Sequence, residues 1–305
     1  MLCAGLGKFW LNHGKVVGYL KLEVPPGKDK AAGTSGDAAF MQRLLAAQAA
    51  SGSLAGAPQT LKADYARLSP GKDLVIIEGL ALNLSKGLPE AVDARVLVVH
   101  DYALPLSAAL PEYIKIGQRL LGLVLNKVPQ NKLADARSQA ARDLGAAGIK
   151  LLGTIAEDRL LAALSIGELA GIVQGKILNN PENSEELVEN FMLGALTFDS
   201  GVDYFNRKNN KAVLLKGDRP DMQLAALQTS IKCLVISGGI APIPMVAIQA
   251  KDKKVPLIQA AGDNLSLVSL IENAVSRAKF GEERKLPHLL EILDRSLDMQ
   301  TLAAL

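Results

Sequence analysis

The sequence predicts an α/β protein of two domains, in which helices cover parallel β-sheets. Short runs of β-branched and apolar residues alternate with longer Ala- and Leu-rich segments of helical periodicity along the 305 residues, as in repeated strand–helix units. The apolar content of 49% is high enough for buried cores and excludes a disordered chain. The polar stretch 175–186, with its Asn-Pro step, interrupts the alternation and predicts a domain boundary.

The first domain is expected to span residues 1–180. Its expected strands are residues 15–22, 74–78, 94–100, 122–126 and 151–155. Its expected helices are residues 2–12, 37–50, 61–68, 109–120 and 132–145. A doubly wound domain normally begins with a strand, so this pattern predicts that a first strand is missing in front of the first helix.

A second alternating block predicts a smaller α/β domain over residues 187–285. Its expected helices are residues 187–196, 222–229, 244–251 and 265–279, and its expected strands are residues 211–216, 233–237 and 256–259. Behind it, residues 286–305 carry an apolar stripe at helical spacing, which consists of Leu289, Leu290, Ile292, Leu293 and Leu297. This stripe predicts an amphipathic helix that docks on another surface or forms an oligomer.

Charge and cysteine content exclude several classes of function. The net charge of +3 is too small to predict binding to nucleic acid or to an anionic membrane. No apolar run approaches the ~20 residues of a membrane span, and no secretory signal is present. Cys3 and Cys233 lie far apart in apolar runs, which is typical of reduced core thiols and favours a cytoplasmic location.

Four polar residues are expected at the carboxyl edge of the first sheet, where such folds bind ligands. Glu78 ends a buried strand and could hold Mg²⁺ against phosphate oxygens, or it could be a solvated strand-end acid. Lys21 could supply positive charge to a triphosphate, or it could be a solvated lysine. Asp37 is either a second metal ligand or, as the sequence alone favours, a helix N-cap. Asn126 could read the edge of a purine base or simply form a turn.

A phosphate-binding loop is absent from this set. The pattern G-x-x-x-x-G-K-[ST] does not occur in the sequence. Gly5 and Gly7 fall inside the first expected helix and are interpreted as packing glycines. Two explanations stay open: a gene start placed too late, or a domain that has lost the ability to use ATP. The first is favoured because the opening helix is intact.

In the second domain, glycine-rich turns follow successive strands. The residues that could face an anionic ligand there are Gly217, Asp218, Arg219, Gly238, Gly239 and Asp263. Glycine turns at strand ends let backbone N–H groups approach an anion. The alternative is ordinary turn chemistry between a strand and a helix, in which Asp218 caps a helix that starts near Pro220.

These residues carry a resemblance to known families. The segment KAVLLKGDRPDMQLAAL at 211–227, with CLVISGG at 233–239, resembles the DRTGG domain. GTIAEDRLL at 153–161 is similar to the stretch before that domain in the N-terminal region of long phosphotransacetylases. The first half resembles their dethiobiotin-synthetase-like P-loop NTPase domain through GYLK at 18–21, DAAF at 37–40, IEG at 77–79 and LVLNKVP at 123–129.

The resemblance implies roles for individual residues. It places Lys21 near phosphates or substrate, makes Asp37 and Glu78 ligands of Mg²⁺, and turns Asn126 toward adenine. Asp218 and Arg219 would belong to the signature of the DRTGG domain, which is regarded as regulatory and has no assigned reaction. ATP and Mg²⁺ are expected cofactors only if a phosphate loop precedes the first helix.

The expected function is therefore regulatory or ligand-sensing, in acetyl-phosphate and acetyl-CoA metabolism, without acetyltransferase activity. The expected partners are a separately encoded phosphotransacetylase and further copies of the chain. The first alternative is an ATP- and Mg²⁺-dependent carboxylate ligase or synthetase of the dethiobiotin or cobyrinate type. The second alternative is a pure scaffold that oligomerises through the second domain and the C-terminal tail.

Overall fold

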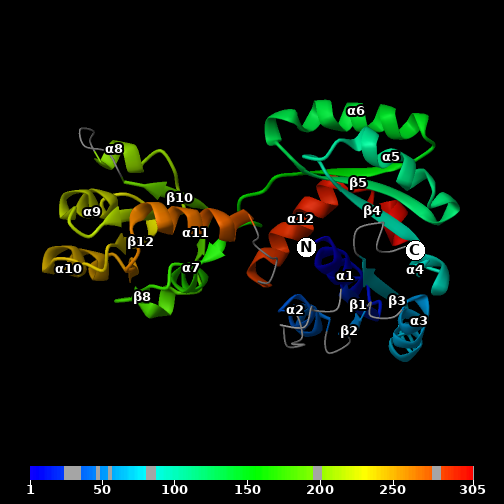
Figure 1. The fold of residues 1–305 in the computed structure, drawn as a ribbon, viewed down its shortest axis with the longest axis horizontal. Helices are drawn as coiled ribbons and strands as arrows, with labels where there is room; N and C mark the ends of the chain where they lie inside the picture. Colours follow the sequence, from blue (N-terminus) through cyan, green and yellow to red (C-terminus); the bar gives the residue numbers. More distant parts are fainter. Residues whose placement is uncertain are drawn as a thin grey trace. The chain divides into compact units, whose positions relative to one another are not determined.

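The computed structural model describes residues 1–23, 36–45, 49–53, 57–79, 87–194, 201–276 and 283–304. It divides into two compact units (Figure 1). The first unit comprises Met1–Asp158 together with Phe280–Leu305, and the second comprises Arg159–Lys279. The predicted α/β class with parallel sheets is confirmed. Among the helices of the described ranges, none is long and apolar enough to cross a bilayer.

The boundary between the two units follows Asp158, which is earlier than the polar stretch 175–186 where a domain boundary was expected. The polar stretch belongs to the second unit and packs against one of its strands. The amide of Asn179 donates to the carbonyl of Val255 (3.0 Å) and its Oδ1 accepts from the N–H of Leu257 (2.7 Å). Asn183 donates to a backbone carbonyl of the same segment at 2.8 Å. The asparagines that suggest a linker in the sequence therefore hold this stretch against a strand.

The strands of the first unit form two parallel three-stranded sheets rather than the one sheet expected. The strand order of one sheet is β2 (Ala49–Ser53), β1 (Val17–Glu23), β3 (Leu74–Glu78). The strand order of the other sheet is β4 (Val96–Asp101), β5 (Leu120–Val128), β6 (Leu151–Ala156). Within the described residues, no strand pairs with the second edge of β3 or of β4, so the sheets stay separate. The helices are α1 (Leu2–Asn12), α2 (Gly36–Leu44), α3 (Ala57–Leu68), α4 (Leu88–Ala91), α5 (Leu106–Ile114) and α6 (Leu133–Ala146).

Strand β2 was not predicted, and the helix expected over residues 37–50 overlaps its start. Its sequence, Ala-Ala-Ser-Gly-Ser, contains no β-branched residue. Parallel pairing with β1, which sets Tyr19 opposite Ala49, gives this segment its strand conformation. Likewise, the helix expected over residues 109–120 lies earlier, as α5, and residues from Leu120 onward belong to β5.

The C-terminal segment returns to the first unit. It forms α12 (Leu286–Ser296) and α13 (Met299–Ala303) after a short 3-10 turn, Glu283–Lys285. Leu289 and Leu293 pack where Gly5 of α1 leaves room, because a Cβ on Gly5 would lie 2.3 Å from Leu293 Cδ1. The stripe thus docks on its own unit through the buried Leu289, Ile292, Leu293 and Leu297, and Leu290 is half-buried. The interpretation of Gly5 and Gly7 as packing glycines is confirmed.

The second unit contains a five-stranded sheet of order β10 (Asn190–Leu193), β11 (Lys211–Lys216), β12 (Ile231–Ser237), β13 (Leu257–Gln259), β8 (Lys176–Ile177). The first four strands are parallel and β8 is antiparallel. A short antiparallel ladder joins β7 (Leu164–Ser165) to β9 (Leu187–Val188). The helix expected over residues 187–196 is wrong: β9 and β10 lie there, and β10 is fixed by its pairing with β11.

Helices cover both faces of this sheet (Figure 1). Helices α7 (Ile166–Ile172) and α11 (Asn264–Ser276) bury one set of alternating strand residues, such as Leu214 and Val235. Helices α8 (Gly201–Phe205), α9 (Pro220–Leu227) and α10 (Pro244–Asp252) lie by the other set, such as Leu215 and Ile236. The unit is a three-layer α/β/α sandwich, in which β10 forms one edge.

Candidate functional site

Lys21 and Glu78 lie side by side in the first unit. They are direct partners in the parallel pairing of β1 with β3. Oε2 of Glu78 accepts a hydrogen bond from the hydroxyl of the fully buried Tyr19, which holds the carboxylate in place. Burial, with a smaller contribution from Glu78, raises the pKa of the Cys3 thiol to about 11. Cys3 is therefore a protonated thiol at neutral pH.

The other two predicted residues of this edge do not join that pair. Asn126 lies on β5 in the other sheet, where it is the register partner of Asp101. Its neighbour Lys127 forms an ion pair with Asp101 (2.7 Å), and this contact holds the pKa of the Asp101 carboxyl below its usual range. Asp37 belongs to α2, but its side chain lies outside the described part of the chain.

The described side chains supply only part of a Mg²⁺-ATP site. Glu78 is one carboxylate, and one of its oxygens is already engaged by Tyr19. Across the described ranges, no cluster of three His, Cys, Asp or Glu side chains is arranged to hold a metal. Octahedral Mg²⁺ bound to a nucleotide also needs phosphate oxygens that the protein keeps in position. These side chains alone therefore do not fit the group, and the roles of Lys21, Asp37, Glu78 and Asn126 stay predictions.

The glycine turns of the second unit lie at the carboxyl ends of its parallel strands. The N–H of Gly217 donates to Ser237 O (3.2 Å), and the N–H groups of Gly238 and Gly239 donate to the carbonyls of residues 262 (2.9 Å) and 260 (2.9 Å). Gly238 and Gly239 also have positive φ angles of 81° and 70°, which explains the choice of glycine. These three N–H groups stabilise the turns themselves, so they are not free to bind an anion in this structure.

The charged residues of the same edge are also engaged locally. Arg219 pairs with Asp221 at 2.8 Å, two residues along the chain. Asp263 accepts the N–H of Ser266 (2.9 Å) at the start of α11, and that contact lowers the pKa of its carboxyl. Asp218 is exposed and does not cap α9, because the N-cap position is occupied by Arg219. Their assignment as ligand-binding residues remains a prediction.

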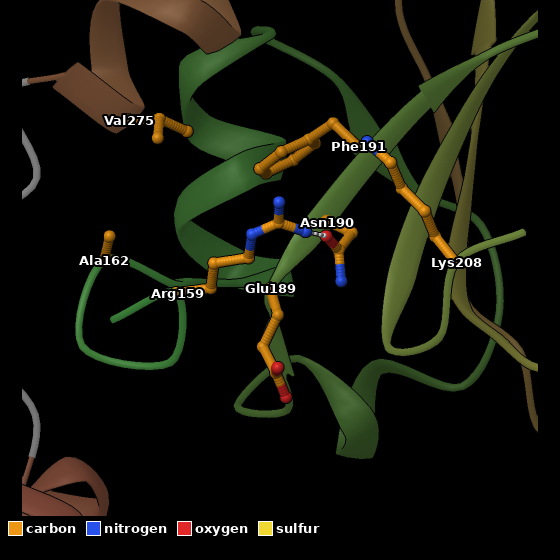
Figure 2. A pocket seen from close by; sticks show the side chains of 7 residues that line it. All are labelled: Arg159, Ala162, Glu189, Asn190, Phe191, Lys208 and Val275. Atoms are coloured by element: carbon orange, nitrogen blue, oxygen red, sulfur yellow. Dashed lines mark hydrogen bonds between the residues drawn. The ribbon is translucent and has the colours of Figure 1, made fainter. Parts of the chain in front are cut away.

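A cavity of about 310 Å³ lies elsewhere in the second unit, at the amino end of β10 (Figure 2). Its lining consists of Arg159, Ala162, Glu189, Asn190, Phe191, Lys208 and Val275. Because β10 and β11 run parallel, this cavity and the glycine turns are at opposite ends of the sheet. Its volume is at the lower end of the ~300–1,000 Å³ of small-molecule sites.

Hydrogen bonds position the polar side chains of this cavity. Nη1 of Arg159 donates to Oδ1 of Asn190 at 2.7 Å, the dashed line in Figure 2. The Asn190 amide in turn donates to the carbonyl of Asn209 at 2.8 Å. Oε1 of Glu189 accepts from the amide of Asn210 at 2.7 Å. The cavity thus presents a guanidinium whose position is set by a side-chain amide.

Sequence reasoning missed this cavity. Its residues come from the segment after β6, from β10 and the residue before it, from the turn before β11 and from α11. No local motif joins such distant positions, and β10 itself was predicted to be helical. A partial signal was present in the GTIAEDRLL segment, whose arginine is Arg159.

Parts of the chain are similar to known proteins. Residues 168–274 match the family model of the DRTGG domain. The phosphate acetyltransferase of Synechocystis sp. is 19% identical over 266 residues, which cover 79% of this chain and 38% of that protein. The chain thus spans well under half the length of this curated relative. These two findings show a DRTGG domain in the second unit and a resemblance to part of a phosphate acetyltransferase.

The chain is also similar to a solved structure. It comprises the CBS and DRTGG domains of the regulatory region of Clostridium perfringens pyrophosphatase, complexed with the activator diadenosine tetraphosphate. The match has a TM-score of 0.33 and 14% identity, and it covers 62% of this chain and 79% of that one.

Proposed function

We propose that this DRTGG-domain protein is a ligand-sensing regulator that acts in the cytoplasm on acetyl-phosphate and acetyl-CoA metabolism. The observation that carries the proposal is the DRTGG match at residues 168–274 within a chain that resembles a phosphate acetyltransferase. The cavity of Figure 2 supports it, because that cavity gives the DRTGG unit a place for a small ligand. The proposed regulator has no acetyltransferase activity of its own.

The test is reconstitution with a separately encoded phosphotransacetylase. The rate of acetyl-CoA formation from acetyl phosphate is measured with and without the full chain, and complex formation is followed by co-elution. We expect the chain alone to be inactive, to co-elute with the enzyme and to change its rate. Unchanged rates and separate elution at about 10 μM of each protein would contradict the proposal, because regulatory contacts commonly have micromolar affinity.

A second candidate function is an ATP- and Mg²⁺-dependent carboxylate ligase or synthetase. The observation that favours it is the pairing of Lys21 with Glu78 on neighbouring strands at the carboxyl edge of a parallel sheet. Release of phosphate from ATP with Mg²⁺ is measured for the full chain and for Glu78→Gln. Under the regulatory proposal we expect no turnover from either protein. Robust turnover that Glu78→Gln abolishes would favour the ligase instead.

Self-association of the chain is a further part of the proposal. Its mass in solution is measured by light scattering after size-exclusion chromatography, and we expect more than one copy per particle. A monomer at all concentrations tested would remove this part and leave the ligand-sensing role in place.

A further inference from the structure

We propose that the cavity of Figure 2 binds a nucleoside monophosphate, with its phosphate at Arg159 and Lys208 and its base on Phe191. The proposal rests on the ligand-sensing function above and gives it a site and a class of ligand. It places the ligand at the amino end of β10, away from the glycine turns that the sequence singled out.

Two cations of the cavity, Arg159 and Lys208, suit the anionic part of the ligand. Among the described residues, the Arg159 guanidinium makes one hydrogen bond, to Asn190. It therefore keeps further N–H donors, in a planar arrangement suited to phosphate oxygens. Lys208 is exposed, has no ion pair within the described ranges, and extends from its turn toward Phe191 in Figure 2.

The one carboxylate of this lining is held apart from the cations. The side chain of Glu189 is fixed by the amide of Asn210 at 2.7 Å. Figure 2 shows it pointing away from Phe191, whereas the guanidinium of Arg159 lies toward the ring. The side of Phe191 that faces Arg159 and Lys208 is therefore positively charged, which favours an anion there.

An apolar space next to Phe191 suits the base of the ligand. Phe191 also lines a second cavity, of about 320 Å³, between the edge of the sheet and α11. That cavity is lined by Phe191, Met192, Leu193, Ala212, Leu214, Val235, Val268, Ile271 and Glu272. An apolar space beside a half-buried aromatic ring suits a flat, weakly polar group such as a nucleobase, since bases stack on aromatic side chains.

The two cavities that Phe191 lines differ in charge. The second cavity contains one charged side chain, the carboxylate of Glu272. This carboxylate disfavours a second anionic group at that end and can accept a hydrogen bond from an amino group. The two cavities together therefore select a ligand with an anion at one end and a neutral base at the other. Acetyl phosphate or inorganic phosphate fills only the cationic end.

The experiment measures binding to the full chain by isothermal titration calorimetry, with adenosine 5′-monophosphate, adenosine and inorganic phosphate as probes. We expect adenosine 5′-monophosphate to bind at least about tenfold more tightly than adenosine, which lacks the charge-assisted hydrogen bonds of the phosphate, and at least about tenfold more tightly than inorganic phosphate, which lacks the stacking of the base. No binding of adenosine 5′-monophosphate at about 5 mM would overturn the proposal. Equal affinity for inorganic phosphate would also overturn it, as the base would then contribute nothing.

Matched variants locate the site. Lys208→Ala and Arg207→Ala remove the same charge from neighbouring exposed positions, but only Lys208 lines the cavity. We expect Lys208→Ala and Arg159→Ala each to weaken binding about tenfold and Arg207→Ala to leave it unchanged. Phe191→Leu, which keeps an apolar side chain on β10, should weaken adenosine 5′-monophosphate but not inorganic phosphate.

A variant at the other end of the sheet completes the test. Arg219→Ala removes a cation beside the glycine turns and should leave affinity unchanged. If Arg219→Ala abolishes binding while Lys208→Ala does not, the site is at the glycine turns and the proposal is wrong. Binding without any effect on a phosphotransacetylase would refute the proposed function alone. An effect on the enzyme without nucleotide binding would refute this inference alone.

Discussion

Replacing Gly153 by alanine should displace the C-terminal segment from the first unit. Gly153 lies in β6, where it forms an antiparallel bridge with Leu297. A Cβ at this position would be 2.2 Å from the carbonyl oxygen of Ser296 and 2.5 Å from Leu297 Cδ2. The first of these neighbours is backbone, so relief of the contact requires the end of α12 to move.

The expected loss of stability follows from three contributions. Overpacking of a filled site costs about 1–3 kcal/mol. Moving the segment also strains the hydrogen bond from Asp298 N–H to Leu152 O (2.7 Å), which contributes ~1 kcal/mol. Replacing a glycine by alanine also lowers the conformational entropy of the unfolded chain, which offsets about 0.4–1 kcal/mol of the lost stability. The free energy of unfolding should therefore fall by about 1–3.5 kcal/mol.

The assay is urea unfolding combined with amide hydrogen exchange of residues 286–304. We expect Gly153→Ala to lower the urea midpoint and to speed exchange in α12 and α13 first. Gly145→Ala is the matched control, because Gly145 is exposed in α6 and a Cβ there meets nothing within 4 Å. It should stabilise by ~0.5–1 kcal/mol through helix propensity. If Gly153→Ala stays within ~0.5 kcal/mol of the parent with unchanged exchange, the packing argument is refuted.

Three further results are expected. Contacts with Lys150 and the start of α13 hold the pKa of the Asp298 carboxyl well below its usual range. The ionised carboxylate therefore stabilises the fold above the ordinary pKa of ~3.9, and this stabilisation is lost as pH falls below that value. The decrease in urea midpoint between pH 7 and pH 3 should be smaller in Asp298→Asn than in the parent, and an equal decrease would contradict this. Burial raises the pKa of the Cys233 thiol to about 12, so a thiol reagent at pH 8 should label it only after unfolding, and rapid native labelling would show otherwise. Asn179→Ala leaves the carbonyl of Val255 and the N–H of Leu257 without their side-chain partner. The free energy of unfolding of the second unit, measured with urea, should fall by ~1–3 kcal/mol, whereas the exposed control Asn206→Ala should change it little.

Most strands of both units could be predicted because their composition is distinctive. The β-branched runs that became β3 and β12 appear in the sequence as buried strands and have nearly the predicted bounds. By contrast, β2 consists of alanine, serine and glycine, and β10 is a short run, Asn-Phe-Met-Leu. Neither carries a local strand signal, so only pairing with a neighbouring strand reveals them.

In the candidate sites, too, the sequence predicts some features and only the folded structure reveals the others. The neighbouring positions of Lys21 and Glu78 follow from the rule that parallel strands end at one edge, and the register confirms them as partners. That rule locates residues but not their hydrogen-bond partners. The N–H groups of the glycine turns could be considered anion donors from the sequence, but the folded turns use them for their own carbonyl groups.

The sequence by itself determined the α/β class, most of the buried strands, the packing role of Gly5 and the similarity of its second part to the DRTGG domain. These features depend on residue types at short spacing, which local periodicity records. Only the tertiary structure decided the separation of the first unit's strands into two sheets, the burial of the C-terminal stripe against α1 and β6, and the cavity that joins Arg159 to Phe191, Lys208 and Val275. Each of these depends on segments far apart in the chain, whose contacts form only when strand pairing and side-chain packing bring them together.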